Sequence, residues 1–196
     1  PTIGPYLLPK ILSDLTTAYP GLDLHVRETV TSRLIAELAE GRIDTAILAL
    51  PVSEPSLEEV PLFEEEFVLI RPATDADKPV PDREMLREMR VLLLEEGHCF
   101  RDQALSFCNL QGRQPRELLE GSSLSTLVQL VGAGIGVTLI PEMALAVETR
   151  SASVTVSRFA GPQPKRQIGM VWRRTSPLAS QLQKIAAVVR HAGASG

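Results

Sequence analysis

The sequence predicts an α/β protein of two lobes, in which each lobe is a mixed sheet flanked by helices. Two observations lead to this prediction. Apolar runs with the length and period of strands alternate with amphipathic runs of helical period along the whole chain. This alternation begins again after a polar, proline-bearing stretch at residues 73–82, which indicates a crossing between lobes. We expect one discontinuous lobe at residues 1–72 and 168–196, and a second lobe at residues 73–167.

The first lobe begins with helical and strand patterns joined by short turns. A helix is expected up to Pro20, and a second helix from Thr31, whose hydroxyl suits an N-cap, to Gly41. Apolar alternation at residues 22–28 and the apolar run 43–50 predict strands. This order of elements favours parallel strands with helices on both faces of the sheet.

The rest of the chain continues the alternation and then returns to the first lobe. Two strand-like runs, 57–62 and 67–72, precede the crossing, and the glutamates between them are interpreted as a solvated edge. The later helices are expected at residues 83–89, 100–110, 124–131, from 141, and 178–191. The later strands are expected at residues 91–96, 116–120, 137–140, 153–159 and 167–173.

Composition excludes several classes of protein. The 196 residues are 44% hydrophobic and 22% charged, which is ordinary for a globular chain with a core. With 20 Lys+Arg and 24 Asp+Glu, the net charge of -4 argues against a DNA-binding face within this chain. No apolar run reaches the roughly 20 residues that span a bilayer. Because the chain starts with Pro1 and not Met, we expect it to be a piece of a longer protein.

The segment EEGHCFRDQALSFC contains both cysteines and is the most informative part of the sequence. A strand, a glycine and then a helical run place Cys99 at the N-terminus of a helix. Unpaired backbone N–H groups and the positive end of the helix dipole stabilise a thiolate there. His98 and Arg101 flank this thiol and can add positive charge or hydrogen bonds, and Asp102 is a further polar neighbour.

Cys108 falls on one helical face with Phe100, Ala104 and Phe107, a spacing typical of burial. If the segment is helical, nine steps of about 1.5 Å place the Cα atoms of Cys99 and Cys108 about 13 Å apart, whereas a disulfide needs about 4.4–6.8 Å. A bridge therefore requires the helix to unwind, and it would contribute about 2–3 kcal/mol, enough to bias two conformations. From the residues alone, two unreactive core thiols are the commoner arrangement.

Other kinds of site fit the sequence less well. Two cysteines with one adjacent histidine give too few ligands, at unsuitable spacing, for zinc, so no metal or other cofactor is expected. The glycines of residues 132–136 follow a helix and precede a strand, which is the reverse of the order in a phosphate-binding turn. We interpret them as a helix C-cap with a tight turn, and Ser122 and Ser123 as helix caps.

Over essentially all of its residues, the chain resembles the effector domain of LysR-type transcription regulators. The resemblance rests on five segments, GPYLLP, GRIDTAILAL, GHCFRDQALSFC, SSLSTLVQLVGAGIGVTLIP and GMVWRRTSPL. The block GHC…RDQ…FC, with eight residues between its cysteines, is similar to the OxyR branch of that family, which senses hydrogen peroxide. The resemblance implies the two-lobed, periplasmic-binding-protein-like (type 2) fold.

The resemblance also implies a role for each thiol. Cys99 would be the peroxidatic cysteine, oxidised by hydrogen peroxide to a sulfenic acid, and Cys108 the resolving cysteine that closes a disulfide. Thiol reductants of the glutaredoxin or thioredoxin type would reopen that bond. The residues that would bind peroxide or support the thiolate are Thr2, Thr31, His98, Arg101, Asp102 and Arg166. Arg166 is expected in a turn, KRQIG, and the two threonines at the N-termini of first-lobe helices.

The resemblance implies a cytoplasmic transcription activator and not an enzyme. Such a domain would form homodimers and homotetramers, would bind no membrane, and would reach DNA only through an N-terminal helix-turn-helix domain absent from these residues. Three alternatives remain open. They are a LysR-type domain that binds a small organic effector and carries incidental cysteines, a periplasmic solute-binding protein, and a thiol peroxidase.

Overall fold

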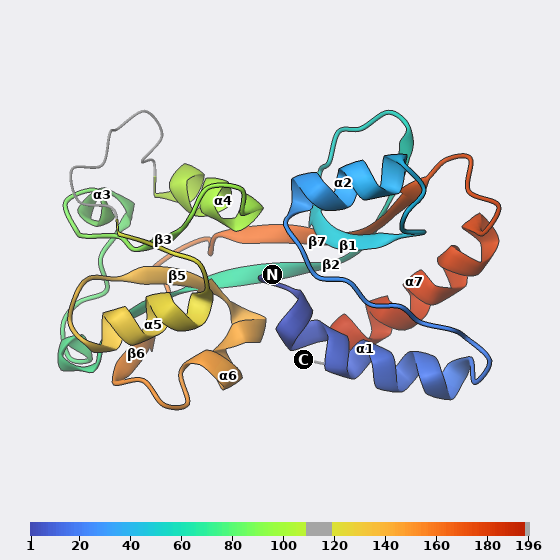
Figure 1. Cartoon of the computed structure of the whole chain (residues 1–196). Helices are drawn as coiled ribbons and strands as arrows, with labels where there is room; N and C mark the ends of the chain where they lie inside the picture. The colour runs from blue at the N-terminus through green and yellow to red at the C-terminus, as the bar shows by residue number, and fades with distance from the viewer. Residues whose placement is uncertain (109–118, 195–196) are drawn as a thin grey trace. The chain divides into compact units, whose positions relative to one another are not determined.

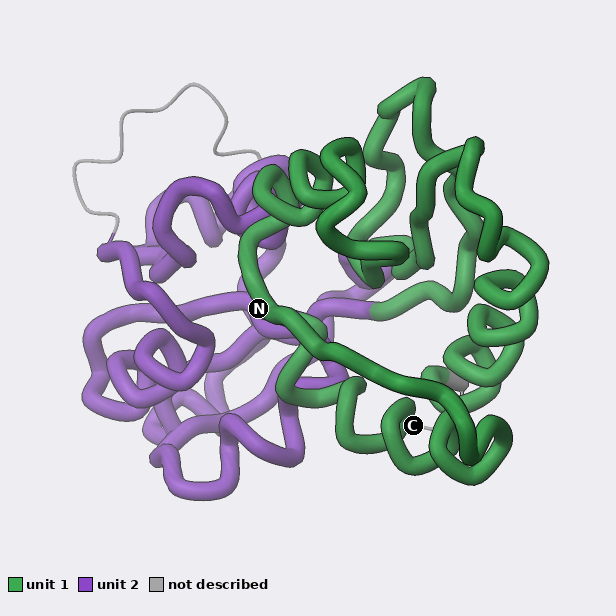
Figure 2. The backbone as a smooth tube through the Cα atoms, turned by 45° about the vertical axis from the view of Figure 1, so that its right-hand side comes forward, with its two compact units in different colours: residues 1, 3–65, 166–196 green, residues 2, 66–165 purple. Residues whose placement is uncertain are grey.

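The computed structural model describes residues 1–108 and 119–194, and the chain divides into two compact units (Figure 2). Unit 1 contains residues 1, 3–65 and 166–196, and unit 2 contains residues 2 and 66–165. Each unit combines strands with helices, as Figure 1 shows.

Two long strands carry the chain from one unit to the other. The chain leaves unit 1 inside β2 (Leu57–Pro72) and returns inside β7 (Lys165–Arg173). The crossings follow residues 65 and 165, and not residues 72 and 167 as the sequence suggests. Each crossing lies within an unbroken strand, whereas the sequence pattern indicates a solvated edge at the glutamates 64–66 and a turn at residues 165–169.

Unit 1 is built on the strands β1 (Ala46–Leu50), β7 and the first part of β2, with β7 between the other two. β1 pairs with β7 in antiparallel register, from Ala46 opposite Val171 to Leu50 opposite Gln167. The helices of this unit are α1 (Gly4–Ala18), α2 (Thr31–Ala39) and α7 (Ala179–Ala194), and α1 packs beside α7 (Figure 1).

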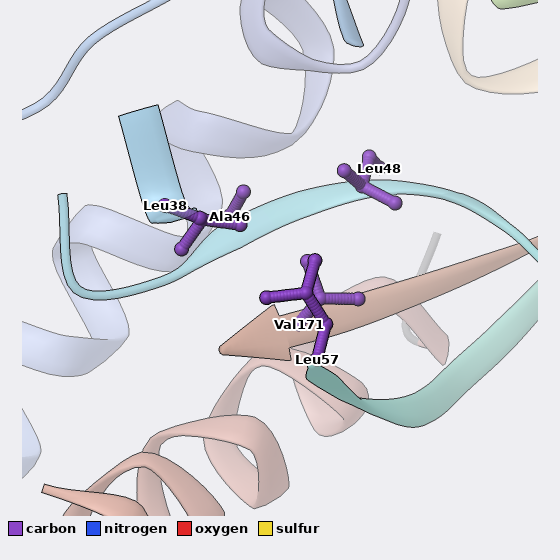
Figure 3. Close-up of a cluster of buried hydrophobic side chains, with 5 residues drawn as sticks. All are labelled: Leu38, Ala46, Leu48, Leu57 and Val171. Carbon is purple, nitrogen blue, oxygen red and sulfur yellow. The ribbon is translucent and has the colours of Figure 1, made fainter. Parts of the chain in front are cut away.

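The core of unit 1 joins α2 to the sheet. Five buried side chains form one cluster, shown in Figure 3, which consists of Leu38, Ala46, Leu48, Leu57 and Val171. They come from α2, β1, β2 and β7, so elements distant in sequence meet here. Because burying one Leu or Val side chain contributes about 1.5–3 kcal/mol, this cluster is a main source of the unit's stability.

Two expectations for the start of unit 1 are wrong. Residues 22–28 form no strand, because no strand of the described residues pairs with them, and Val26 is 52% exposed. Thr31 does not cap α2. It is the first residue of the helix, after the N-cap residue Val30, and no side chain accepts a hydrogen bond at this end.

Unit 2 contains the second part of β2 and most of the short elements. β2 pairs with β5 (Thr138–Pro141) along one edge and with β6 (Val154–Ser157) along the other. A separate pair is formed by β3 (Leu93–Leu94) and β4 (Glu120–Gly121). The remaining elements are α3 (Arg83–Leu86), α4 (Cys99–Phe107), α5 (Leu124–Gly132), α6 (Leu145–Glu148) and the 3-10 turns Ala73–Asp75 and Glu142–Ala144.

Strand direction is where the sequence prediction fails most clearly. The ladders β1–β7, β2–β5 and β2–β6 are antiparallel, whereas β3–β4 and the single bridge between Val91 and Val137 are parallel. The runs 57–62 and 67–72 form one strand, β2, and not two. A long strand can pair with returning segments on both edges, which the local order of elements does not reveal. Parts of the expected elements 100–110 and 116–120 lie outside the described residues.

The glycine-rich segment after α5 ends the helix, as predicted. The N–H of Ile135 donates to Leu130 O (3.1 Å) and that of Gly134 to Val131 O (2.9 Å), and Gly134 has φ of 80°. This pair of bonds with a left-handed residue is the Schellman motif. At the other end of α5, the Ser123 hydroxyl accepts a hydrogen bond from the Thr126 N–H (3.2 Å), which confirms the predicted cap.

Among the described residues, the helices are too short or too polar for any of them to cross a lipid bilayer.

Replacing Gly136 by alanine is expected to destabilise unit 2. A Cβ atom there would lie 2.4 Å from the carbonyl oxygen of Arg90, which also accepts a hydrogen bond from the Val137 N–H (3.0 Å). We expect the free energy of unfolding to fall by about 1–3 kcal/mol, measured by urea titration. Gly21→Ala is the matched control, because a Cβ atom there meets nothing within 4 Å. Equal stability of Gly136→Ala and wild type would contradict this close backbone approach.

Candidate functional site

Helix α4 has one cysteine at each end and begins after a short turn that follows β3. Its N-cap residue is His98 and its first residue is Cys99, which confirms the predicted position of this thiol. Gly97, in the preceding turn, has φ of 96°, a conformation that favours glycine and redirects the chain from strand to helix. Cys99 is partly exposed and free. Its thiol therefore lies at the N-terminus of α4, where solvent can reach it.

Arg101 ties the first turn of α4 to the neighbouring strands. Its Nη1 donates a hydrogen bond to the Leu94 carbonyl (2.8 Å) and lies 2.7 Å from Glu120 Oε1. The side chain is only 12% exposed. These two contacts fasten the first turn of α4 to β3 and β4.

His98 has an unsatisfied polar atom beside Cys99. The residue is buried, and its Nδ1 has no hydrogen-bond partner among the described residues. Burial lowers the pKa of this imidazole, so it is neutral at neutral pH. The neutral ring therefore has one nitrogen that can still donate or accept a hydrogen bond, depending on its tautomer. Asp102, also in the first turn, is exposed.

Cys108 caps the other end of α4 in an apolar environment. Its thiol is fully buried, on the same helical face as Phe100 and Ala104, as predicted. The Phe100 ring packs edge-on against Phe67, with centroids 4.8 Å apart. Burial raises the pKa of Cys108 to about 12, an effect that the nearby charge of Arg83 opposes. This thiol is therefore protonated at neutral pH.

The two thiols are separated by a continuous helix. Helical residues run from Cys99 to Phe107, and the Cys108 N–H donates to Ala104 O (3.0 Å). At about 1.5 Å per residue, the Cα atoms lie about 13 Å apart, well beyond the reach of a disulfide. Both cysteines are free in this arrangement. A bond between them thus requires α4 to open.

The contacts of Phe107 at the end of α4 have no signal in the sequence. The Phe107 ring packs on Phe159, with centroids 5.0 Å apart, and the guanidinium carbon of Arg83 lies 4.0 Å from the Phe107 centroid. Helical spacing places Phe107 only near the buried face. Neither partner could be found from the sequence, because Arg83 and Phe159 are distant along the chain from Phe107 and from each other.

Arg166 lies in unit 1 and forms a buried ion pair. Its Nε and Nη2 lie 2.8 and 2.7 Å from Glu65 Oε2, and the two side chains are 1% and 5% exposed. The segment expected to be a turn is part of β7. The expectation of a solvated glutamate edge is wrong for Glu65, because strand alternation buries it while Glu64 stays exposed.

The predicted site residues divide between the two units. Thr31, half-buried at the start of α2, lies in unit 1 with Arg166. Unit 2 holds Thr2, which is buried, together with the α4 residues His98, Cys99, Arg101, Asp102 and Cys108. Within the described parts of the chain, no three His, Cys, Asp or Glu side chains are grouped closely enough to hold a metal ion.

The LysR substrate binding domain family matches residues 1–194. The chain belongs to this LysR family. It is 43% identical over 197 residues to a probable hydrogen peroxide-inducible genes activator of Streptomyces viridosporus, an alignment that covers 98% of this chain and 63% of the relative. It is 39% identical over 195 residues to the DNA-binding transcriptional dual regulator OxyR of Escherichia coli K12, covering 97% and 63%. The chain thus spans less than two thirds of these curated relatives.

Solved structures of LysR-family proteins confirm the α/β, two-lobed fold class. A cysteine-to-serine mutant of OxyR from Corynebacterium glutamicum, with hydrogen peroxide bound, gives a TM-score of 0.91 at 33% identity, covering 100% of this chain and 63% of that one. The reduced OxyR regulatory domain from Pseudomonas aeruginosa gives 0.84 at 35% identity, covering 97% and 94%. The type 2 periplasmic-binding-protein-like fold therefore describes this LysR domain.

We expect the two thiols of the folded chain to differ strongly in reactivity with iodoacetamide. At pH 8 a thiol with a pKa of about 12 is ionised to on the order of one part in ten thousand, and burial blocks the reagent as well. Peptide mapping after brief alkylation should therefore find Cys99 modified and Cys108 intact. Unfolding in guanidinium chloride should make both react. Alkylation of Cys108 at the rate of Cys99 in the folded chain would contradict its burial.

Proposed function

We propose that this chain is the peroxide-sensing regulatory domain of a LysR-type transcription regulator, in which Cys99 is oxidised and then captured by Cys108. The observation that carries the proposal is the position of two free thiols at opposite ends of one helix. One is partly exposed beside a histidine with an unsatisfied nitrogen, and the other is sealed in the core. The names of relatives as activators of hydrogen peroxide-inducible genes support the same conclusion.

The first step is a two-electron oxidation at sulfur. The Cys99 thiolate attacks one oxygen of hydrogen peroxide, the S–O bond forms and the O–O bond breaks. The leaving oxygen departs as hydroxide and takes up a proton to become water, and Cys99 becomes a sulfenic acid. Hydrogen-bond donors that face the departing oxygen stabilise its developing charge.

The second step stores the signal as a disulfide. The Cys108 sulfur attacks the Cys99 sulfur, the S–S bond forms, and the S–O bond breaks to release hydroxide, which the thiol proton converts to water. Two thiols and one peroxide thus give one disulfide and two waters. Because α4 separates the sulfurs, this step requires the helix to unwind, so chemistry and conformational change are coupled.

The supporting residues fall into two groups. His98 is suited to bind peroxide through its unsatisfied Nδ1, and Arg101 to fix and polarise the first turn of α4. Asp102 and Thr2 are the further polar groups of unit 2 that we assign to this site. Thr31 and Arg166 belong to unit 1, and we propose that they act on peroxide as the family resemblance implies.

The remaining parts of the proposal concern the whole regulator. We infer that it works in the cytoplasm, where reducing conditions keep both thiols free and where reductants of the glutaredoxin or thioredoxin type reopen the disulfide. The domain assembles as a homodimer and homotetramer, and a separate helix-turn-helix domain, outside this chain, binds DNA. The new shape of oxidised unit 2 then alters subunit packing.

Micromolar hydrogen peroxide is expected to remove both free thiols from the reduced chain and to join residues 99 and 108 in one disulfide-linked peptide, detected by mass spectrometry. Cys108→Ser should stop at a sulfenic acid, trapped by a 1,3-diketone reagent. Cys99→Ser should leave the Cys108 thiol unchanged, because that buried thiol does not react by itself. Persistence of both thiols in the wild-type chain would defeat the proposal.

Two further measurements distinguish a sensor from a thiol peroxidase and from a domain that binds an organic effector. With thioredoxin and its reductase present, a thiol peroxidase would consume many equivalents of peroxide at a sustained rate, whereas a sensor is reset only slowly. A domain whose cysteines are incidental would be stabilised by an organic effector, and Cys99→Ser would not change that stabilisation.

A further inference from the structure

The C-terminal end of α4 is held by a group that the proposed chemistry does not use. Phe107 is half-buried and contacts the Phe159 ring, while the Arg83 guanidinium lies over the Phe107 ring at 4.0 Å. Arg83 is the exposed first residue of α3, which Asp82 caps by accepting a hydrogen bond from the Met85 N–H (2.8 Å). We call these three side chains, Arg83, Phe107 and Phe159, the Phe107 clamp.

The two ends of α4 are anchored differently. At the first turn, Phe100 is buried against Phe67, and Arg101 binds both the Leu94 carbonyl and Glu120. At the last turn, the described side-chain contacts next to Cys108 are those of the half-buried Phe107 ring. This ring packs on the Phe159 ring and lies under the exposed Arg83 guanidinium. The last turn, which Cys108 must leave to reach Cys99, is therefore held by the clamp in addition to the burial of Cys108 itself.

We propose that Arg83 is a positioning residue for Cys108. Through its cation–π contact with Phe107 it keeps the last turn of α4 closed, and so sets how fast the disulfide forms once Cys99 is oxidised. This inference rests on the proposed function. It adds no reactant, because the S–S bond still forms at the expense of the S–O bond.

Two effects of Arg83 oppose each other, and geometry decides between them. The positive charge of Arg83 lowers the pKa of the Cys108 thiol against the effect of burial, which by itself favours attack by the thiolate. In the closed helix, however, the Cα atoms of Cys99 and Cys108 lie about 13 Å apart, too far for a disulfide, so ionisation of Cys108 there leads to no bond. Only the opened segment reacts, and the contact that resists opening therefore controls the rate.

Arg83→Met tests the proposal because it removes the charge and keeps an unbranched apolar side chain. We expect the disulfide to close about fivefold faster after peroxide, the equivalent of about 1 kcal/mol and the scale of an exposed cation–π contact. Quenched-flow mass spectrometry measures sulfenic acid at Cys99 and the disulfide separately. The rate of sulfenic acid formation at Cys99 should stay unchanged. General destabilisation of unit 2 would instead change both rates.

Three further variants make the test specific. Arg83→Lys should restore most of the wild-type rate, because a lysine ammonium also binds an aromatic face. In a Phe107→Leu chain, where closure is already fast, Arg83→Met should add nothing further. Arg150→Met removes an equally exposed charge from unit 2 and should leave both rates unchanged.

A second measurement is independent of oxidation. In a Cys99→Ser chain, the rate at which iodoacetamide labels Cys108 at fixed pH reports the opening of α4, and Arg83→Met should raise it about fivefold. Unchanged or slower closure and labelling in Arg83→Met, or an acceleration that persists without Phe107, would overturn the proposal. Failure of the wild-type chain to form any 99–108 disulfide would instead refute the proposed function, and with it the role of Arg83 in closure.

Discussion

The backbone hydrogen bonds of α4 are the constraint on which the rest of the site depends. They extend from the first turn to the bond between the Cys108 N–H and Ala104 O, and they keep two thiols of one short segment apart. Nine residues correspond to about two and a half helical turns, so the side chains of Cys99 and Cys108 point to opposite faces of the helix. One face is turned toward solvent and the other toward the core. A difference in reactivity thus follows from helical geometry before any neighbouring group acts.

The neighbours then increase this difference. At the exposed end, Arg101 fixes the first turn of the helix and His98 has a nitrogen without a partner among the described residues. At the buried end, apolar packing raises the pKa of Cys108 to about 12. The reduced chain therefore has one accessible thiol and one buried, protonated thiol. In the proposed function, a signal arises only when the buried thiol leaves the core, so that chemistry at one sulfur changes the shape of the unit.

Short-range patterns in the sequence predicted the α/β class, α4, the burial of Cys108, the Ser123 cap and the glycine turn after α5. Each depends on residues within a few positions of one another. The absent strand at residues 22–28 and the antiparallel ladders depend on partners far along the chain, which local alternation does not specify. The same applies to Glu65, whose buried carboxylate pairs with Arg166 about a hundred residues away, and to Arg83, which meets Phe107 only in the folded unit. Thr31 failed as a cap because a suitable residue type does not by itself fix the backbone angles that capping needs.

The bond from Arg101 to Leu94 and its ion pair with Glu120 have a further consequence for reversibility. They fasten the Cys99 end of the segment to the β3–β4 pair, whereas the other end is held by the burial of Cys108 and the contacts of Phe107. In the proposed cycle we therefore expect Cys108 to move and Cys99 to stay, so that the groups around His98 keep their arrangement. Reduction then only requires the end of α4 near Cys108 to become helical again, because the groups around Cys99 and His98 are already in place for the next molecule of peroxide.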